Sequence, residues 1–353
     1  MNSSRLTRVL STTGVPIAIV LVLVVVVFQI LSPVFLEGSA VKDYVTNAIP
    51  ILLLTVGVAI VITAGGIDLS TGTVAGLAAG TSLWALHKGY PTVVAVLIGL
   101  ATGVLFGLAN GLMITRFGIN DFIVTLATLN IAAGLLVVLT EKVPLQGVAT
   151  SSFSSLVYGS ILGVPTSFWI AAAIVVIMQV VVARTVLGRR IFAVGVAAEA
   201  ASNAGVDVRR IRLSTFVISG LLAGAAGVLL ASRLGSVQAF LGVGYEFTAI
   251  AGAVLGGVSL AGGRGSVWAA VVGGLLLATL QQGLRLNGVD PVYFSIVQGL
   301  CIVAGVVFDR GVQRIVLNRM LGRPTDEPPP ELVAEAVGAA APSTPAARSG
   351  AEA

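Results

Sequence analysis

Long apolar stretches, each close to the length that crosses a bilayer, dominate the pattern of hydrophobic and polar positions along this chain. A helix needs about 20 apolar residues to span the hydrocarbon core, and fewer where it is broken or buried in protein. By this rule the sequence predicts ten helical spans. They cover residues 15–36, 45–64, 71–86, 92–115, 122–140, 166–183, 213–232, 246–261, 266–284 and 292–308. The pattern therefore predicts an all-α membrane protein with about ten transmembrane helices, including short or broken ones.

Composition agrees with a membrane protein. Of the 353 residues, 56% are hydrophobic and only 10% are charged, against about 25% charged in soluble domains. The chain holds a single cysteine, Cys301, and a single histidine, His87, which excludes a disulfide framework and a His/Cys metal cluster. Cys301 lies in an apolar run and is expected to be a small buried hydrophobe. No metal site is expected.

The first apolar stretch follows Arg5 and Arg8, as the core of a signal peptide would. Its uncharged run from Val15 to Leu36 is too long for a typical signal peptide, and nine further spans follow. We expect this stretch to be a retained helix.

Orientation follows from the distribution of Lys and Arg, which favour cytoplasmic loops. With the N-terminus inside and ten alternating spans, the outside loops hold Lys42, Lys88, Lys142, Arg233 and Arg285. The other fifteen of the twenty Lys and Arg residues lie inside. This bias predicts an even number of spans and cytoplasmic N- and C-termini in a cell membrane.

The chain is expected to have three parts. Residues 1–14 form a cytoplasmic N-terminal tail, and residues 15–310 form the transmembrane domain. Residues 311–353 form a cytoplasmic tail, which is rich in Pro, Ala and acids beyond Gly322 and is predicted to be largely disordered.

One polar stretch interrupts the apolar pattern. Between two predicted spans the chain reads AGGIDLSTG, from Ala64 to Gly72. Asp68 or Ser70 could cap the helix that follows, because a carboxylate favours the positive end of a helix. The alternative is a direct role for Asp68 in a substrate path. Gly76 and Gly80 follow at the four-residue spacing of a small-residue face for close helix contact.

The longest inside loop, residues 184–212, carries six arginines. Its middle, Ala197–Ala204, favours a short helix that Gly205 could end. Such a helix could dock a cytoplasmic partner. Equally, the loop could be a basic anchor on anionic lipid.

Three motifs, in order and at suitable spacing, resemble those of one family. They are GGIDLSTG at 65–72, AVGVAAEAASNAGVDVRRIRLS at 193–214, and GYEFTAIAGAVLGGVSLAGGRGS at 244–266. NGVDPVYFSIVQGLCIVAGVVFDR at 287–310 resembles the closing helix of that family. The chain is similar, from about Ile49 to Arg310, to the ribose-type ABC transporter permeases. It departs from their pattern at Val196, Ala197 and Ala133, and at Asp121, where proline is usual.

The resemblance implies the permease subunit of a binding-protein-dependent importer, most simply for a monosaccharide. It implies a second permease copy or paralogue, a cytoplasmic ABC ATPase that carries ATP and Mg, and an extracytoplasmic substrate-binding protein. The broken-helix motif beside the path would be Gly65, Gly66, Asp68, Leu69, Ser70 and Gly72. The coupling helix seated on the ATPase would include Glu199, Ala200, Ala201, Gly205 and Val206.

Four polar residues inside spans are candidates to line the path, although each could instead bond a neighbouring helix. They are Asn110, Asn130, Gln281 and Gln282. Glycine-rich faces are expected to let helices approach closely. These faces hold Gly76 and Gly80, the set Gly220, Gly224 and Gly227, and the pair Gly273 and Gly274.

No catalytic apparatus is evident. The chain lacks a GxxxxGK[ST] phosphate loop, and GGRGS at 262–266 is too short and has no lysine. We therefore expect no enzyme activity and no cofactor in this chain, and no nucleic-acid binding. The same architecture could import nucleosides, a signalling sugar or branched-chain amino acids. A more remote alternative is an ion-coupled secondary transporter, which usually needs carboxylates at the membrane midplane. Asp68 is the acid expected within a span's depth.

Overall fold

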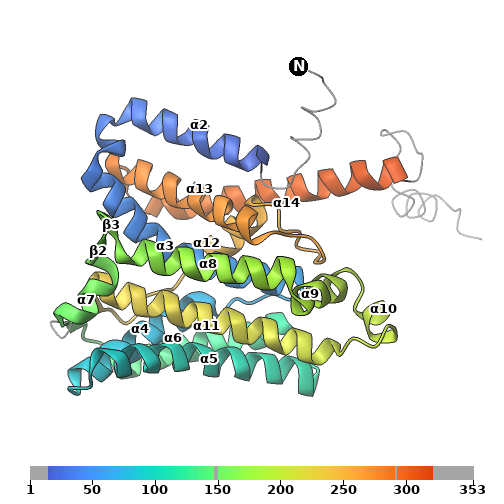
Figure 1. Cartoon of the computed structure of the whole chain (residues 1–353), viewed down its shortest axis with the longest axis horizontal. Coiled ribbons are helices and arrows are strands. Elements are labelled where there is room, and N and C mark those ends of the chain that lie inside the picture. The colour runs from blue at the N-terminus through green and yellow to red at the C-terminus, as the bar shows by residue number, and fades with distance from the viewer. Residues whose placement is uncertain (1–14, 147–149, 291, 321–353) are drawn as a thin grey trace, which may run out of the picture. The chain divides into compact units, whose positions relative to one another are not determined.

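The computed structural model describes residues 15–146, 150–290 and 292–320, and it is almost entirely helical (Figure 1). The helices are α2 (Val15–Leu31), η1 (Pro33–Leu36), α3 (Gly38–Thr63), α4 (Thr71–His87), α5 (Thr92–Phe117), α6 (Asp121–Leu139), α7 (Ser151–Tyr158), α8 (Thr166–Arg184), α9 (Val186–Val196), α10 (Ala198–Asn203), α11 (Val208–Leu234), α12 (Tyr245–Leu255), α13 (Val267–Leu286) and α14 (Val292–Met320). Four two-residue strands pair antiparallel: β1 (Leu145–Gln146) with β4 (Ser236–Val237), and β2 (Ser160–Ile161) with β3 (Val164–Pro165).

Each of the ten predicted spans falls on a helix of its own. Six of these helices are long and apolar enough to cross a membrane: α3, α5, α6, α8, α11 and α13. Several boundaries were wrong. Helix α3 begins at Gly38 rather than at residue 45, and α11 begins at Val208 rather than at residue 213. Helix α2 ends at Leu31 rather than at residue 36, α12 ends at Leu255 rather than at residue 261, and α14 continues to Met320. The number of spans and the side of each terminus stay predictions. Of the predicted tails, residues 1–14 and 321–353 lie outside the described residues, whereas residues 311–320 of the predicted C-terminal tail belong to α14.

The chain divides into two compact units, Met1–Val306 and Val307–Ala353. The described part of the second unit is the final stretch of α14, residues 307–320. All the contacts discussed below lie within the first unit.

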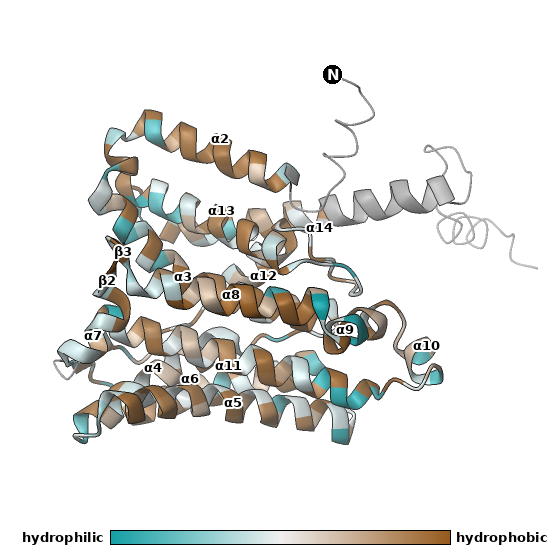
Figure 2. Cartoon of the chain, viewed as in Figure 1, coloured by the Kyte–Doolittle hydropathy of each residue, from teal (hydrophilic) through white to brown (hydrophobic). Residues whose placement is uncertain are grey.

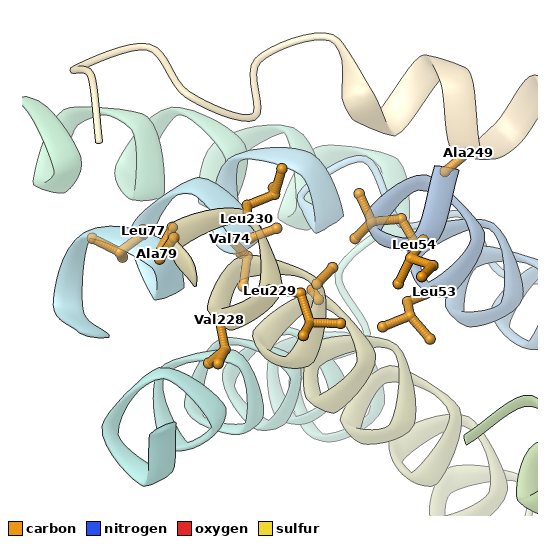
Figure 3. Packing of buried hydrophobic residues seen from close by; sticks show 14 of the residues in the cluster. Leu53, Leu54, Val74, Leu77, Ala79, Val228, Leu229, Leu230 and Ala249 are labelled. Carbon is orange, nitrogen blue, oxygen red and sulfur yellow. The ribbon is translucent and has the colours of Figure 1, made fainter. Parts of the chain in front are cut away.

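The centre of the first unit is built from α3, α4 and α11. Most residues of α4 are buried, and the C-terminal two thirds of α3, from Ala48 to Thr63, are buried on every side. Figure 3 shows Leu53 and Leu54 of α3, Val74 and Leu77 of α4 and Leu229 of α11 within one apolar cluster. A helix that is apolar all round is stable only when neighbours or lipid surround it completely.

Threonines inside these helices satisfy their hydroxyl groups locally. Thr55 and Thr63 of α3 donate to the carbonyl oxygens of Ile51 and Ala59, four residues earlier. The bond removes the cost of burying a free hydroxyl group. Such residues therefore fit an apolar interior without needing a partner on another helix.

Glycines set the closest helix contacts. Gly103 of α5 lies against Gly220 and Gly224 of α11, and a Cβ atom at Gly103 would overlap the Gly220 carbonyl oxygen. Gly273 of α13 makes the same kind of contact with Gly252 and Gly256, around α12. These approaches confirm that the predicted faces at 220–227 and 273–274 allow close packing.

The predicted helix contact at Gly76 and Gly80 is confirmed for Gly80, which faces α6, but was wrong for Gly76. A Cβ atom at Gly76 would overlap the carbonyl oxygen of Leu241, which lies in the non-helical connection between α11 and α12. Gly80 faces side chains of α6 and, more distantly, Val237 of β4. This glycine face accommodates a segment of turns as well as a helix.

The first helix is part of the packed structure, as expected for a retained span. Phe28 of α2 is buried, and its ring occupies the space where a side chain at Gly283 of α13 would stand. Phe28 also stacks on Phe35 of η1, with ring centroids 5.8 Å apart.

The two ends of the first unit are built from different elements. Figure 1 places α7, β2 and β3 at one end and α9 and α10 at the other. Figure 2 shows hydrophobic residues along α2, α5 and α8, and hydrophilic residues at α10 and at the neighbouring end of α11. Side chains begin the helices at both ends: Thr150 caps α7 and Asp207 caps α11.

Candidate functional site

The stretch Ala64–Ser70 joins α3 to α4 and is held by three other helices. Arg212 of α11 donates to the Gly65 carbonyl oxygen at 3.2 Å. The carboxylate of Asp121, at the start of α6, accepts the backbone N–H of Ile67 at 2.7 Å. Thus Asp121, where the chain departs from the family pattern, has a definite partner in the motif.

Asp68 is buried, with 2% of its surface exposed, and hydrogen bonds satisfy both carboxylate oxygens. One oxygen accepts from the backbone N–H and the hydroxyl group of Ser70, at 3.0 and 2.7 Å. The other accepts from the hydroxyl group of Ser219 on α11 at 2.8 Å. Asn110 of α5 donates to the Ser70 hydroxyl oxygen at 2.9 Å. The network joins the α3–α4 connection to α5 and α11. Without these bonds, burying the polar groups of Asp68 and Ser70 would cost much free energy.

This geometry replaces the predicted helix cap. Ser70 is the residue before the first turn of α4, and its side chain accepts no bond from that turn. Asp68 bonds the N–H of Ser70 itself, so its carboxylate shapes the turn before the helix rather than capping the helix. Leu69 between them is buried, with 7% exposed.

The loop at residues 184–212 contains two helices where the sequence predicted one. The predicted helix at 197–204 is present as α10, and Gly205 follows it with φ +83°, a conformation that favours glycine. The preceding helix, α9, was missed, because it is short and two adjacent arginines interrupt its apolar pattern: Ile191 and Val194 are buried while Arg189 and Arg190 are exposed.

The coupling candidates of α10 divide by exposure. Glu199 and Ala200 are exposed, whereas Ala201 is buried with 6% exposed. Val206, which follows α10, is half-buried and packs with Ala201 in the apolar cluster that contains Ile191 and Val194 of α9. The exposed face is therefore free to meet another protein, while Ala201 and Val206 hold the helix in place.

Near its C-terminal end, α9 lies directly against the end of α3 and the α3–α4 connection. A Cβ atom at Gly195 would overlap the Thr63 carbonyl oxygen, and Gly263 donates its N–H to that oxygen at 2.9 Å. A Cβ atom at Gly262 would lie 3.0 Å from the Gly65 Cα atom. We call Thr63, Gly65, Gly195, Gly262 and Gly263 the glycine junction. It brings three segments distant in sequence into backbone contact.

The four path candidates do not lie together as one site. Asn110 is buried and belongs to the Asp68 network, and its side-chain oxygen has no partner among the described residues. Asn130 is exposed and bonds the Leu126 carbonyl oxygen of its own helix. Gln281 is exposed, whereas Gln282 is buried and accepts from Arg285. Their path-lining role stays a prediction.

A second buried acid escaped the sequence reasoning. Glu246, in the first turn of α12, is 1% exposed. One of its carboxylate oxygens accepts the N–H of Gly244 at 3.0 Å, and the other packs where a side chain at Gly72 would stand. It is the first residue of the predicted span at 246–261, and a charge at the end of a span is expected to reach water rather than to be buried. The signal that could have found it is the glycine pair around it, Gly242 and Gly244.

The described residues hold no cluster of three or more His, Cys, Asp or Glu side chains suited to a metal ion. Both oxygens of Asp68 have protein donors, and Glu246, on α12, is remote from Asp68 in the sequence.

Comparison with known proteins identifies the family. The family model described as "Branched-chain amino acid transport system / permease component" matches residues 40–306. The ribose import permease protein of Bacillus subtilis (strain 168) is 36% identical over 291 residues, 82% of this chain and 90% of that protein. The L-arabinose transport system permease protein of Escherichia coli (strain K12) is 36% identical over 262 residues, 74% and 80% of the two chains. The D-allose transport system permease protein of Escherichia coli (strain K12) is 32% identical over 297 residues, 84% and 91% of the two chains.

No solved structure matches the chain significantly. The family match covers the α3–α4 connection, α9 and α10, and the glycine junction in one continuous range. The chain belongs to the ribose-type ABC transporter permeases, a family of integral cell-membrane transport subunits.

Proposed function

We propose that this chain is the membrane permease subunit of a binding-protein-dependent ABC importer that carries a monosaccharide. Relatives named for ribose, L-arabinose and D-allose transport, each at least 32% identical over most of the chain, support this substrate class. The chain forms the translocation path together with a second permease copy or a paralogue. An extracytoplasmic binding protein delivers the sugar.

The topology completes the proposal. Ten spans with both termini in the cytoplasm place α9 and α10 at the cytoplasmic end, where the ATPase docks. Residues 15–310 are the transmembrane domain, and a cytoplasmic tail precedes it and another follows it. ATP and Mg bind the partner ATPase, and this chain needs no cofactor of its own.

The observation that carries the mechanism is the glycine junction. Docking forces on α10 pass along the sequence to α9, whose Gly195 rests on the backbone of Thr63 and Gly263. With no side chains between these backbones, the contact cannot absorb displacement by rotamer changes, and close-packed interiors transmit strain. A shift of α9 therefore moves Gly65 and the Asp68 network, so that ATPase closure changes the state of the path.

Purification in mild detergent, followed by mass spectrometry, tests the docking surface. A P-loop ATPase should accompany the chain in fixed ratio. Ala200→Arg places a long charged side chain on the exposed face of α10 and should remove the ATPase. Ser152→Arg, at an exposed residue of α7 at the opposite end of the first unit (Figure 1), is the control and should retain it. A chain that purifies alone yet still transports would overturn the ABC mechanism.

A second experiment tests the junction. Gly195→Ala should leave ATP hydrolysis by the purified complex largely intact while sugar uptake into proteoliposomes falls about tenfold, the effect of about 1.4 kcal/mol of lost coupling. Gly134→Ala, where a new Cβ atom meets nothing within 4 Å, is the control and should preserve both activities. Equal loss of hydrolysis and uptake in Gly195→Ala would contradict transmission through the junction.

Substrate choice needs its own measurement, because the description of the matching family names branched-chain amino acids. Proteoliposomes that hold the complex and its binding protein should accumulate labelled pentose or hexose and exclude labelled leucine. Leucine uptake without sugar uptake would assign the chain to the amino-acid branch.

A further inference from the structure

The connection between α11 and α12 is a non-helical segment that runs along α4. It begins with β4, which pairs with β1, and continues through turns to Gly244. The turns are closed by local bonds, such as the N–H of Leu241 to the carbonyl oxygen of Gln238 at 3.1 Å. Residues 238–247, which include the first turn of α12, are called the descending segment below.

Three glycines of α4 mark the course of this connection. At Gly80, a Cβ atom would lie 3.9 Å from the Val237 side chain. At Gly76 it would overlap the Leu241 carbonyl oxygen, and at Gly72 it would lie 2.5 Å from the carbonyl oxygen of Gly242. The connection thus follows α4 from Gly80 towards the N-terminus of α4 and lies directly on the helix backbone.

The descending segment lies deep in the helix bundle. At about 1.5 Å of rise per residue, Gly80 lies about 10 Å from the end of α4 at His87, and Gly72 lies about 12 Å further along. The whole of α4 is about 26 Å long on the same scale, close to the thickness of the hydrocarbon core of about 30 Å. The neighbours of α4 include α3, α5, α6 and α11, all long enough to span the membrane. The segment therefore reaches the membrane interior.

One side of the segment is exposed. Phe240 is 73% exposed and Val243 51% exposed, and Gln238 is also exposed. Gly242, by contrast, is buried against α4. In the hydrocarbon core, irregular backbone occurs only where protein buries it or where it lines a water-filled cavity. The exposed side of this segment therefore cannot face lipid.

We propose that the descending segment lines the water-filled translocation path, and that Gln238 and Phe240 contact the substrate there. Its exposed side chains suit a neutral polyhydroxylated molecule. The amide of Gln238 can donate and accept hydrogen bonds, and the ring of Phe240 offers an apolar face. Residues 235–244 contain no charged residue, and Glu246 points its carboxylate into the packed interior. The substrate class rests on the proposed function, whereas the lining role follows from the irregular backbone of the segment and the exposure of its side chains.

Cysteine labelling tests the lining role in the full complex. Cys301, the single native cysteine, is first replaced by serine. Phe240→Cys and Val243→Cys are then exposed, in membranes, to a charged thiol reagent. Their controls are Leu105→Cys on α5 and Ile131→Cys on α6, which are 63% and 53% exposed on apolar, spanning helices. The two path positions should react at least about tenfold faster than these controls, because charged reagents are excluded from hydrocarbon.

Substrate protection tests the contact. Excess D-ribose, L-arabinose or D-allose should slow labelling at Phe240→Cys more than at a position outside the path, such as Ser160→Cys. Gln238→Cys gives a further exposed position should Phe240→Cys lower the yield of folded protein.

Two outcomes would overturn the proposal. Labelling as slow as at the lipid-facing controls would mean that the segment faces no water. Slow labelling with oxidative cross-linking of Phe240→Cys between two copies would make the segment a dry subunit interface. Both readouts are independent of uptake. Fast labelling without sugar uptake would thus count against the proposed substrate, and sugar uptake without fast labelling would count against the lining role.

Discussion

Helices α5 and α4 both carry glycines at every fourth residue, yet α5 turns this face mainly to a helix and α4 turns it largely to a non-helical segment. The α5 set is Gly99, Gly103, Gly107 and Gly111, and the α4 set is Gly72, Gly76 and Gly80. In α5 the central contacts are with backbone atoms of α11. The spacing therefore predicts that another backbone comes close, but it does not predict what structure that backbone has.

The difference matters for how each contact responds to strain. A helix backbone is fixed by its own hydrogen bonds, so α11 cannot give way locally to a new atom on α5. The descending segment is held by turns and can shift as a unit. We therefore expect the α5 face to govern stability and the α4 face to govern transport.

The largest effect is expected for Gly103→Ala. The new Cβ atom would overlap the Gly220 carbonyl oxygen and stand 2.6 Å from the backbone nitrogen of Gly224, so both helices must move apart. The free energy of unfolding, measured by denaturant titration in detergent, should fall by about 3 kcal/mol, the upper part of the range for overpacked cores. Gly134→Ala, which adds a Cβ atom in open space, should cause no loss. A neutral Gly103→Ala would mean that α5 and α11 are not held at this distance.

Gly76→Ala should have an intermediate effect on stability. Its Cβ atom overlaps the Leu241 carbonyl oxygen, which belongs to a turn rather than to a helix. Displacement of the segment should lower the unfolding free energy by about 1.5 kcal/mol. Uptake by the reconstituted complex should fall by a larger fraction than the unfolding free energy does. A stability loss equal to that of Gly103→Ala would show that the segment is as rigid as α11, and the comparison would fail.

The smallest effect is expected for Gly80→Ala. Its nearest neighbours are the ends of two flexible side chains, Leu136 and Leu139. These can rotate away, and alanine gains about 0.8–1 kcal/mol of helix propensity over glycine. The net change in unfolding free energy should lie within about 0.5 kcal/mol, with uptake preserved. A loss as large as that of Gly76→Ala would place a rigid contact between α4 and α6.

The sequence located the helices well because the bilayer fixes their length and composition. It failed where a helix is short or amphipathic. The exposed arginines of α9 hid a helix whose fully buried residues are Gly188, Ile191 and Val194. The predicted span at 246–261 ran past the end of α12, because apolar composition does not distinguish the last turn of a helix from the apolar loop that follows it.

The candidate site was predictable as residues but not as contacts. GGIDLSTG identified Asp68 and Ser70 by their polarity in an apolar setting. Asp68 bonds Ser219 and Ser70 bonds Asn110, and both pairs are remote in sequence. Nothing in the sequence distinguishes Ser219 or Asn110 from other polar residues within the spans. The bond of Asp121 to Ile67 also joins positions remote in sequence. In addition, an acidic residue at a helix start is usually expected to stabilise the start of its own helix.

The fit of Phe28 into the space beside Gly283 has a consequence for how such sequences change over generations. The ring on α2 and the missing side chain on α13 share one volume, so each position limits the other. An ancestor with a larger residue at 283 would have tolerated it only beside a smaller residue at 28. A lineage can therefore exchange the bulk between the two helices through a pair of substitutions, whereas either substitution alone leaves a clash or a hole.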